Sequence, residues 1–123
     1  MGTRTTAYAT STGRVLLGGS PPEAVADYLA RTDLRPFTEA TITDPERLAE
    51  EIEQVRRQGW AIADQELAEG LRSVAAPVRD ADSRVVAAVN ISAHITRASV
   101  TTMRRQWLPE LLATTARIEA DLA

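Results

Sequence analysis

The chain lacks several residue types on which whole classes of function depend. It has no cysteine and a single histidine among 123 residues. Disulfides and thiolate metal sites are therefore excluded, and one histidine cannot supply the usual ligand set of a zinc site. All fourteen positive side chains are arginine, which we attribute to codon bias in a GC-rich genome. We expect no metal and no cofactor, and the absence of thiols is compatible with a cytoplasmic protein.

An excess of positive charge and long apolar runs are missing as well. The formal net charge is −3 and the pI is about 5.2, so no basic field attracts nucleic acid or an anionic membrane. No apolar run approaches the ~20 residues that span a bilayer, and the start has no signal-peptide core. What is present, 44% hydrophobic and 25% charged residues, is the composition of one soluble globular domain.

The middle of the chain predicts a β-hairpin. Two runs rich in alanine and β-branched residues flank the turn-forming cluster Asp80-Ala81-Asp82-Ser83, which is the signal of strand, turn and strand. A turn that closes Arg79 onto Arg84 places Ser73 opposite Asn90. The sequence defines the cross-strand partners less firmly than it defines which side chains share a face, because a slip in register changes the partners across the strands.

Alternation along the two strands sorts their side chains onto two faces. The apolar face, expected to pack under helices, carries Val74, Ala76, Val78, Val85, Ala87, Val89 and Ile91. The other face carries Leu71, Ser73, Ala75, Ala88, Asn90 and Ser92. Short polar groups among alanines leave volume lined by a few hydrogen-bonding atoms, as small-molecule pockets do. The alternative is a solvated sheet face. The lack of Lys, Glu or Arg on it favours a pocket.

Helices are expected on both sides of the hairpin, from cap and stop signals. They run from Ser11 to Gly18-Gly19, from a Ser20 cap to about Arg31, from a Thr43 capping box to Gln58, and onward from a Ser99 cap. Pro109 should bend the last helix near Arg105, because proline removes an internal hydrogen bond. The free N–H groups at the start of the first helix could hold a carboxylate. The alternative is that Ser11 and its neighbours only cap it.

The remaining segments are short. Trp60-Ala61-Ile62-Ala63 predicts a strand, and the acidic residues 64–70 predict a loop that faces solvent or, alternatively, forms the rim of the pocket. In the connector at residues 34–43, Phe37 is expected to fill the core.

Four segments resemble the C-terminal, effector-binding half of IclR-type bacterial transcription regulators. They are residues 7–17 (Ala-Tyr-Ala-Thr-Ser-Thr-Gly-Arg-Val-Leu-Leu), 58–60 (Gln-Gly-Trp), 70–77 (Gly-Leu-Arg-Ser-Val-Ala-Ala-Pro) and 86–94 (Val-Ala-Ala-Val-Asn-Ile-Ser-Ala-His). Residues 64–67 and 90–94 look most like the subgroup that controls protocatechuate, 4-hydroxybenzoate and β-ketoadipate catabolism.

The resemblance implies an α/β (α+β), GAF-like domain, an antiparallel sheet flanked by helices. It also implies a pocket for a small carboxylate or aromatic acid effector. The residues it assigns to this pocket are Ser11, Thr12, Ala63, Leu71, Ser73, Asn90 and Ser92. Relatives with small keto-acid effectors usually have a carboxylate at the position of Ala63 and a serine at the position of Asn90. These departures suggest a larger or differently charged ligand.

The resemblance covers residues 1–123 as a partial effector-binding domain. The family's upstream winged helix-turn-helix, through which it contacts DNA, and the N-terminal strands of the sensor are not in this sequence. We therefore expect a chain cut from, or beginning inside, the domain, with no direct nucleic acid contact and no membrane contact of its own. An exposed sheet edge seeks a partner, so we expect a homo-oligomer, dimer or tetramer, through the sheet or the long helix.

A small hydrolase and a purely structural module are the alternatives to the ligand sensor. A small hydrolase would use Ser73 or Ser92 with His94 and Asp64, but no Gly-x-Ser-x-Gly elbow is present, and Ser92 and His94 point in parallel from one strand. A purely structural oligomerisation module would be a remnant without a ligand. We expect a sensor and not an enzyme.

Overall fold

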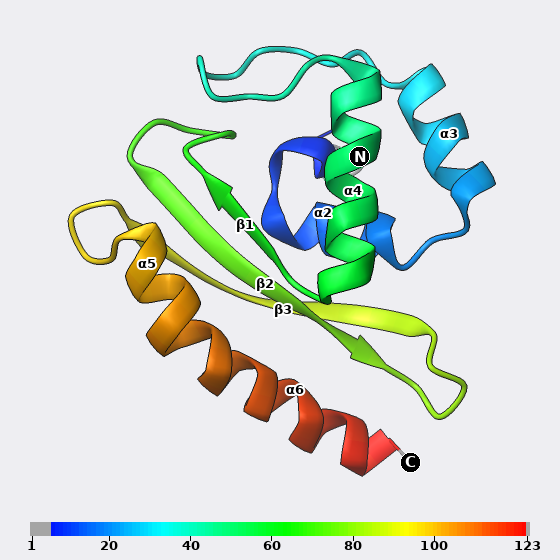
Figure 1. Cartoon of the computed structure of the whole chain (residues 1–123), viewed down its shortest axis with the longest axis vertical. Coiled ribbons are helices and arrows are strands. Elements are labelled where there is room, and N and C mark those ends of the chain that lie inside the picture. Colours follow the sequence, from blue (N-terminus) through cyan, green and yellow to red (C-terminus); the bar gives the residue numbers. More distant parts are fainter. Residues whose placement is uncertain (1–5, 123) are drawn as a thin grey trace.

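The computed structural model describes residues 6–122 and contains a three-stranded antiparallel sheet flanked by helices (Figure 1). The elements are η1 (Ala7–Ala9), α2 (Ser11–Gly18), α3 (Pro22–Arg31), α4 (Pro45–Gln58), β1 (Ala61–Asp64), β2 (Leu71–Arg79), β3 (Val85–His94), α5 (Val100–Thr102), η2 (Met103–Trp107) and α6 (Leu108–Leu122). The fold is therefore α+β, as the sequence predicts. No helix of the described part is long and apolar enough to cross a membrane.

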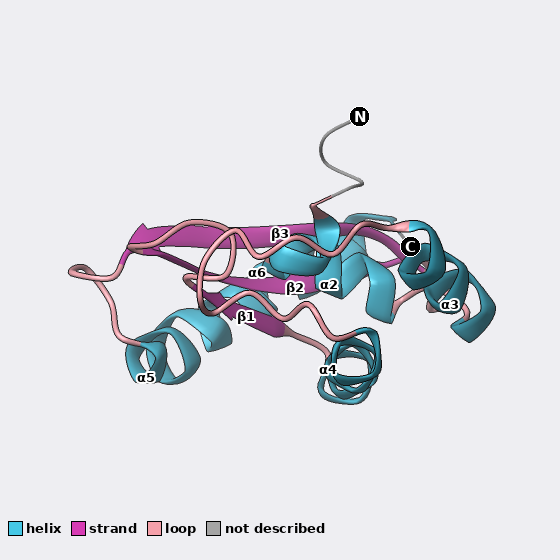
Figure 2. Cartoon of the chain, turned by 90° about the horizontal axis from the view of Figure 1, so that it is seen from above, coloured by secondary structure: helices cyan, strands magenta, loops and turns pink. Residues whose placement is uncertain are grey.

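The sheet has the order β1-β2-β3, and helices cover both of its faces. The α5–η2–α6 segment packs on one face, while α2 lies on the other and packs against α4, which stands in front of it in Figure 1. In both ribbon views α2 stands between the sheet and α3, which is the outermost helix (Figure 2). The helices on these two sides bury separate apolar clusters.

Each face of the hairpin packs as the alternation predicts. On the α6 side, Val74 and Ala76 are fully buried against Met103, Leu108 and Leu111. On the α2 side, the small residues Ala75 and Ala88 pack with Val15, Val55 and Ala61. Small side chains on this second face let α2 approach the sheet closely.

The register of the hairpin differs from the prediction. Ser73 pairs with Ser92 and Ala75 with Asn90, two residues away from the expected pairing, so every side chain keeps its predicted face apart from one. Between the Val78 and Arg79 pairings β3 contains one extra residue. This bulge turns Val85 toward α2, where its side chain lies against Gly19. The assignment of Val85 to the α6 face is therefore wrong.

The turn explains one residue of the two-residue shift in register, and the bulge supplies the other. The amide of Asp80 donates to the Arg84 carbonyl, and the Asp80 carboxylate accepts from the amides of Asp82 and Arg84. The turn thus closes Asp80 onto Arg84 instead of Arg79 onto Arg84, because the Asp80 side chain supplies the acceptor that stabilises the tighter loop.

Two helix caps also differ from the expectation. Asp44, not Thr43, caps α4 by accepting from the Arg47 amide. Ser20 does not cap α3, since its hydroxyl donates back to the Leu16 carbonyl and Pro21 takes the capping position. Pro22 at the first helical position has no N–H that needs a capping acceptor, and the serine hydroxyl closes the preceding helix instead.

Phe37 does not fill the core. Its side chain is 43% exposed and stacks on the fully buried ring of Tyr8, with centroids 6.0 Å apart. Tyr8 occupies the position expected for Phe37, because its hydroxyl can both donate to and accept from the Arg35 backbone.

The last helix contains a π-helical turn around Arg105, where the sequence predicts a bend. Over Met103–Trp107 the helix widens, and the Leu108 amide donates to the Met103 carbonyl five residues earlier. Pro109 has no N–H for the Arg105 carbonyl, and a wider turn is a common response to such a missing bond. Ser99 caps the start of the segment by accepting from Thr102, as expected.

Candidate functional site

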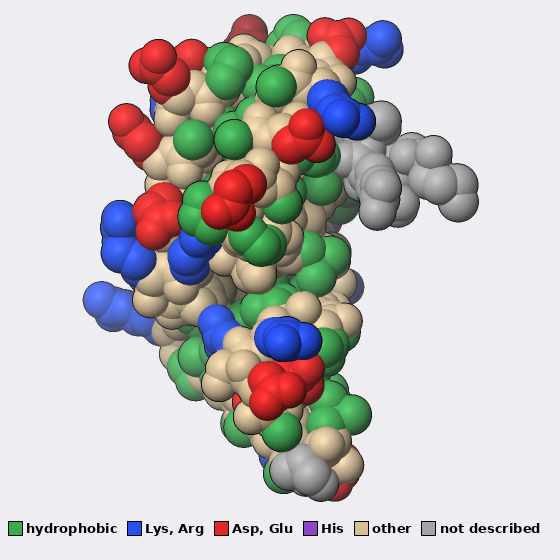
Figure 3. All heavy atoms as spheres, turned by 90° about the vertical axis from the view of Figure 1, so that its right-hand side faces the viewer, with side chains coloured by type: hydrophobic (Ala, Val, Ile, Leu, Met, Phe, Trp, Pro, Cys, Tyr) green, Lys and Arg blue, Asp and Glu red, His purple; other side chains and the backbone are tan. Residues whose placement is uncertain are grey.

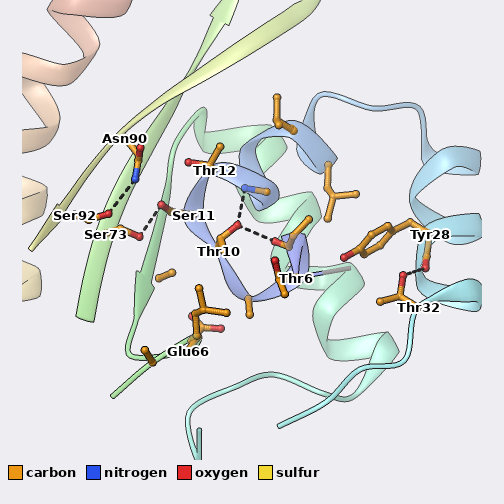
Figure 4. A pocket seen from close by; sticks show the side chains of 18 of the residues that line it. Thr6, Thr10, Ser11, Thr12, Tyr28, Thr32, Glu66, Ser73, Asn90 and Ser92 are labelled. Carbon is orange, nitrogen blue, oxygen red and sulfur yellow. Dashed lines mark hydrogen bonds between the residues drawn. The ribbon is translucent and has the colours of Figure 1, made fainter. Parts of the chain in front are cut away.

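A cavity of about 930 Å³ opens between α2, α3 and the polar face of the sheet (Figure 4). All seven residues assigned to the pocket from the sequence line it, namely Ser11, Thr12, Ala63, Leu71, Ser73, Asn90 and Ser92. They come from four separate stretches of the chain. The antiparallel pairing of β1, β2 and β3 brings the strand residues together, and α2 packs on these strands. The volume falls within the range of small-molecule sites.

The start of α2 contributes polar groups to the cavity lining. Thr10 caps the helix, and its hydroxyl accepts from the Gly13 amide at 2.9 Å. The first intrahelical bond is donated by Arg14, so the amides of Ser11 and Thr12 stand outside the helical ladder. These two N–H groups form the positive end of the helix dipole and face an anion favourably.

Hydroxyl and amide side chains continue from the helix across the sheet. The hydroxyls of Ser11 and Ser73 lie 2.7 Å apart, and the Asn90 side-chain amide donates to the Ser92 hydroxyl at 3.0 Å. Figure 4 shows the two pairs side by side. Ser11 is buried, Ser73 half-buried, and Asn90 and Ser92 exposed. The polar floor is therefore sheltered beneath α2 and open toward β3.

Apolar side chains complete the wall and remain accessible. Leu16, Leu67 and Leu71 line the cavity and are 42%, 41% and 49% exposed. Ala63 adds a small, buried apolar contact to the lining. Exposed leucines around a polar floor suit a ligand that has an apolar body and polar substituents.

The mouth of the cavity lies at α3, a region that the sequence analysis did not assign to the site. Asp27, Tyr28 and Arg31 line it, and the exposed Asp27 and Arg31 side chains pair at 3.0 Å. Tyr28 accepts a hydrogen bond from the Tyr8 amide at 3.1 Å. Burial is the main cause that raises the pKa of Tyr28 above its ordinary value of 10.0. Its spacing from Val25 in an amphipathic helix indicated an inward side chain, but not a cavity.

The acidic loop after β1 lines the cavity, as the alternative interpretation had it, and the expectation that it faces solvent is wrong for Glu66. Glu66 is not in solvent, since it is 8% exposed, lines the cavity and pairs with the fully buried Arg14 of α2. The one available signal was an arginine directly before the apolar run Val15-Leu16-Leu17. Nothing local connected it to a partner 52 residues away.

The hydroxyls and the histidine do not form a nucleophilic triad. His94 Nδ1 bonds to the Thr96 hydroxyl at 2.9 Å, while Ser73 bonds to Ser11 and Ser92 to Asn90. Within residues 6–122 there is also no group of three or more potential metal ligands. The arrangement is suited to hydrogen bonding of a ligand rather than to bond cleavage.

A protein-family comparison agrees with this architecture. The family model described as the C-terminal domain of the bacterial transcriptional regulator IclR matches residues 1–119. The chain belongs to the IclR family. The Pca regulon regulatory protein of Pseudomonas putida is 46% identical over 113 residues, which is 92% of this chain and 39% of that protein. The p-hydroxybenzoate hydroxylase transcriptional activator of Acinetobacter baylyi is 34% identical over 116 residues, 94% of this chain and 42% of that protein.

Solved structures of IclR-family proteins share the fold. A transcriptional regulator from Rhodococcus superposes with a TM-score of 0.91 at 46% identity, over 94% of this chain and 47% of that one. The inducer-binding domain of an Acinetobacter PobR double mutant, in complex with 3-hydroxybenzoic acid, gives 0.89 at 30% identity, over 92% of this chain and 66% of that one. The chain thus spans about two fifths of these curated relatives, which are named as transcriptional regulators and not as enzymes.

Proposed function

We propose that this IclR-type domain binds a small carboxylate or aromatic acid of aromatic catabolism and passes the binding energy to the regulator that contains it. The observation that carries the proposal is the convergence of the α2 N-terminus with Ser73, Asn90 and Ser92 in one cavity. The related inducer-binding domain crystallised with 3-hydroxybenzoic acid supports the same class of ligand.

Each part of the site has a distinct task in this proposal. The amides of Ser11 and Thr12 hold the carboxylate through hydrogen bonds and the helix dipole. Ser73, Asn90 and Ser92 bond to ring hydroxyl or keto oxygens, and Leu71 and Ala63 pack against the apolar body. Because the Ala63 side chain is a single uncharged methyl group, it leaves room on the floor for a ring, which favours an aromatic acid over a small keto acid.

Signalling requires that the ligand bind one arrangement of the regulator more tightly than another. We propose that the chain self-associates as a dimer or tetramer through the β3 edge or α6. β3 ends the sheet, has no partner on its outer side within the described residues, and exposes 54% of Val86. α6 exposes Leu112 and Leu122.

In the longer cytoplasmic regulator, a winged helix-turn-helix would contact DNA. On the face in Figure 3, acidic and basic groups are interspersed.

A thermal-shift screen tests ligand binding. Protocatechuate, 4-hydroxybenzoate, β-ketoadipate and simple keto acids are added to the chain, and a ligand present at 100 times its Kd should raise the Tm by about 10 °C. Ser73→Ala or Asn90→Ala should each weaken binding about fivefold through one lost hydrogen bond. Thr101→Ala, exposed on α5 across the sheet, is the matched control. No response to any compound would favour the structural oligomerisation module.

Light scattering tests the proposed self-association. The dimer or tetramer predicts a mass that grows with protein concentration until it reaches that state. A monodisperse monomer at high concentration would refute it.

A further inference from the structure

Arg14 and Glu66 form a buried ion pair that joins two walls of the cavity. Arg14 Nη1 donates to Glu66 Oε2 at 2.9 Å, Nη2 donates to Oε1, and Nε donates to the Tyr8 carbonyl at 3.0 Å. The two residues are 1% and 8% exposed. A two-pronged contact of this kind fixes both side chains and is among the stronger hydrogen-bonding arrangements in proteins.

The two partners are placed unequally with respect to the cavity. Glu66 lines it together with Leu67 and Ala68, whereas Arg14 lies outside the lining, on the side of α2 that faces η1. Glu66 therefore brings a negative charge to the wall of a site proposed for anions. Asp27, the other acidic residue of the lining, sits at the solvent-exposed mouth and is paired with Arg31.

The backbone at Glu66 is held in place independently of Arg14. The Thr41 hydroxyl donates to the Glu66 carbonyl at 2.5 Å, and the Thr38 hydroxyl donates to the neighbouring Gln65 carbonyl at 2.6 Å. The backbone of the loop is thus fixed by the 38–41 segment. Removing the guanidinium would leave the carboxylate at the cavity wall with no opposite charge.

We propose that Arg14 is a positioning residue that neutralises Glu66 and thereby lets the cavity accept an anionic ligand. The inference rests on the proposed function and specifies its electrostatics. The pair cancels the only negative charge in the sheltered part of the lining that the structure describes. Removing the charge of Arg14 should lower the preference of the site for anionic over neutral ligands. Removing the charge of Glu66 should raise it.

The test compares 4-hydroxybenzoate with its neutral analogue 4-hydroxybenzamide by NMR titration of the Ser73 and Asn90 amides. Arg14→Gln should lower the preference for the anion about tenfold, as one like charge across a partly screened site does. Glu66→Gln, which leaves the arginine unpaired, should raise it. The Arg14→Gln/Glu66→Gln double variant should return within about threefold of the starting value. Arg104→Gln, an exposed residue of η2 on the other side of the sheet from the cavity, is the control and should change it less than twofold.

A second readout needs no bound effector. Anionic carboxy-PROXYL and neutral carbamoyl-PROXYL are added separately, and the amide relaxation enhancement that each causes is measured at Leu71, Ser73 and Asn90. The enhancement by the anionic probe divided by that of the neutral probe reports the local electrostatic potential. Arg14→Gln should lower this ratio and Glu66→Gln should raise it. If wild-type protein binds neither benzoate probe, the proposed ligand class is refuted while this ratio still decides the role of Arg14.

Loss of fold does not obscure the outcome. Removing one member of a buried pair can cost about 3–5 kcal/mol, so both single variants are at risk, whereas the double variant leaves no unpaired charge. Whichever single variant folds carries the test together with the double variant, because only charge masking predicts a shift in the first and its reversal in the second. Equal shifts in the same direction, or no shift in any variant, would overturn the proposal.

Discussion

Replacing Gly13 by alanine should strongly destabilise the domain, although alanine is the better helix former. A Cβ atom built on Gly13 would lie 2.2 Å from the Ala7 carbonyl oxygen and 2.4 Å from the Ala7 Cα. Ordinary contacts begin near 3.4 Å. The backbone of η1 would therefore have to retreat from α2 by roughly 1 Å, far more than a well-packed interior absorbs.

Nothing beside η1 lets it retreat. The next residue, Tyr8, is fully buried, and its hydroxyl both donates to and accepts from the Arg35 backbone, at 2.9 and 2.7 Å. Overpacking costs about 1–3 kcal/mol, and at this clamped site we expect the upper end. The helix propensity of alanine returns less than about 1 kcal/mol. The expected net loss in the free energy of unfolding is about 2–3 kcal/mol.

Urea unfolding followed by circular dichroism measures this loss. Gly59→Ala is the matched control, because Gly59 has a φ of 81° and nothing within 4 Å of its Cβ position. Its loss of about 1 kcal/mol would come from the left-handed backbone alone. A Gly13→Ala protein as stable as wild type would refute the close approach of η1 and α2.

Three further changes probe other parts of the fold. Leu48→Ala, in a fully buried α4 side chain, should lower the free energy of unfolding by about 2–5 kcal/mol in urea titrations, and a loss below 1 kcal/mol would contradict its place in the core. Burial raises the pKa of Tyr28, because the folded protein favours the neutral phenol. The contribution of this phenol to the free energy of unfolding is complete below pH 10 and is lost as pH rises through the folded-state pKa. Chemical unfolding between pH 9 and 11 should therefore show a shallower decline for Tyr28→Phe, and identical declines would refute this. Glu119→Ala removes the acceptor of the Arg79 amide at 2.8 Å and should cost about 1 kcal/mol, detected as faster amide exchange at Arg79; unchanged exchange would count against the contact.

The local elements could be predicted because their signals are local. Gly18-Gly19 and Gly59 mark helix ends, and alternation along 71–78 and 87–92 assigns the faces of the hairpin. A two-residue change of register preserves those faces, so the pattern could not distinguish the two pairings. The carboxylate of Asp80 and the bulge after Val78 decided between them.

The candidate site was predictable where it follows strand alternation and helix capping. Ser73, Asn90 and Ser92 share a face by parity, and Ser11 and Thr12 start a helix that the hydroxyl of Thr10 caps. Their convergence in one cavity was implied by the family resemblance, because no local rule places α2 over that face.

The sequence by itself determined which segments are helical or extended, which strand face is apolar, and which families of chemistry are excluded. These properties depend on composition and on periods of two or about four residues. Only the tertiary structure decided that Glu66 is buried, that Tyr8 rather than Phe37 fills the core, and that Tyr28 reaches the cavity. Each of these depends on a partner far away in the chain, since burial of a charge or a hydroxyl is stable only when a distant group satisfies it.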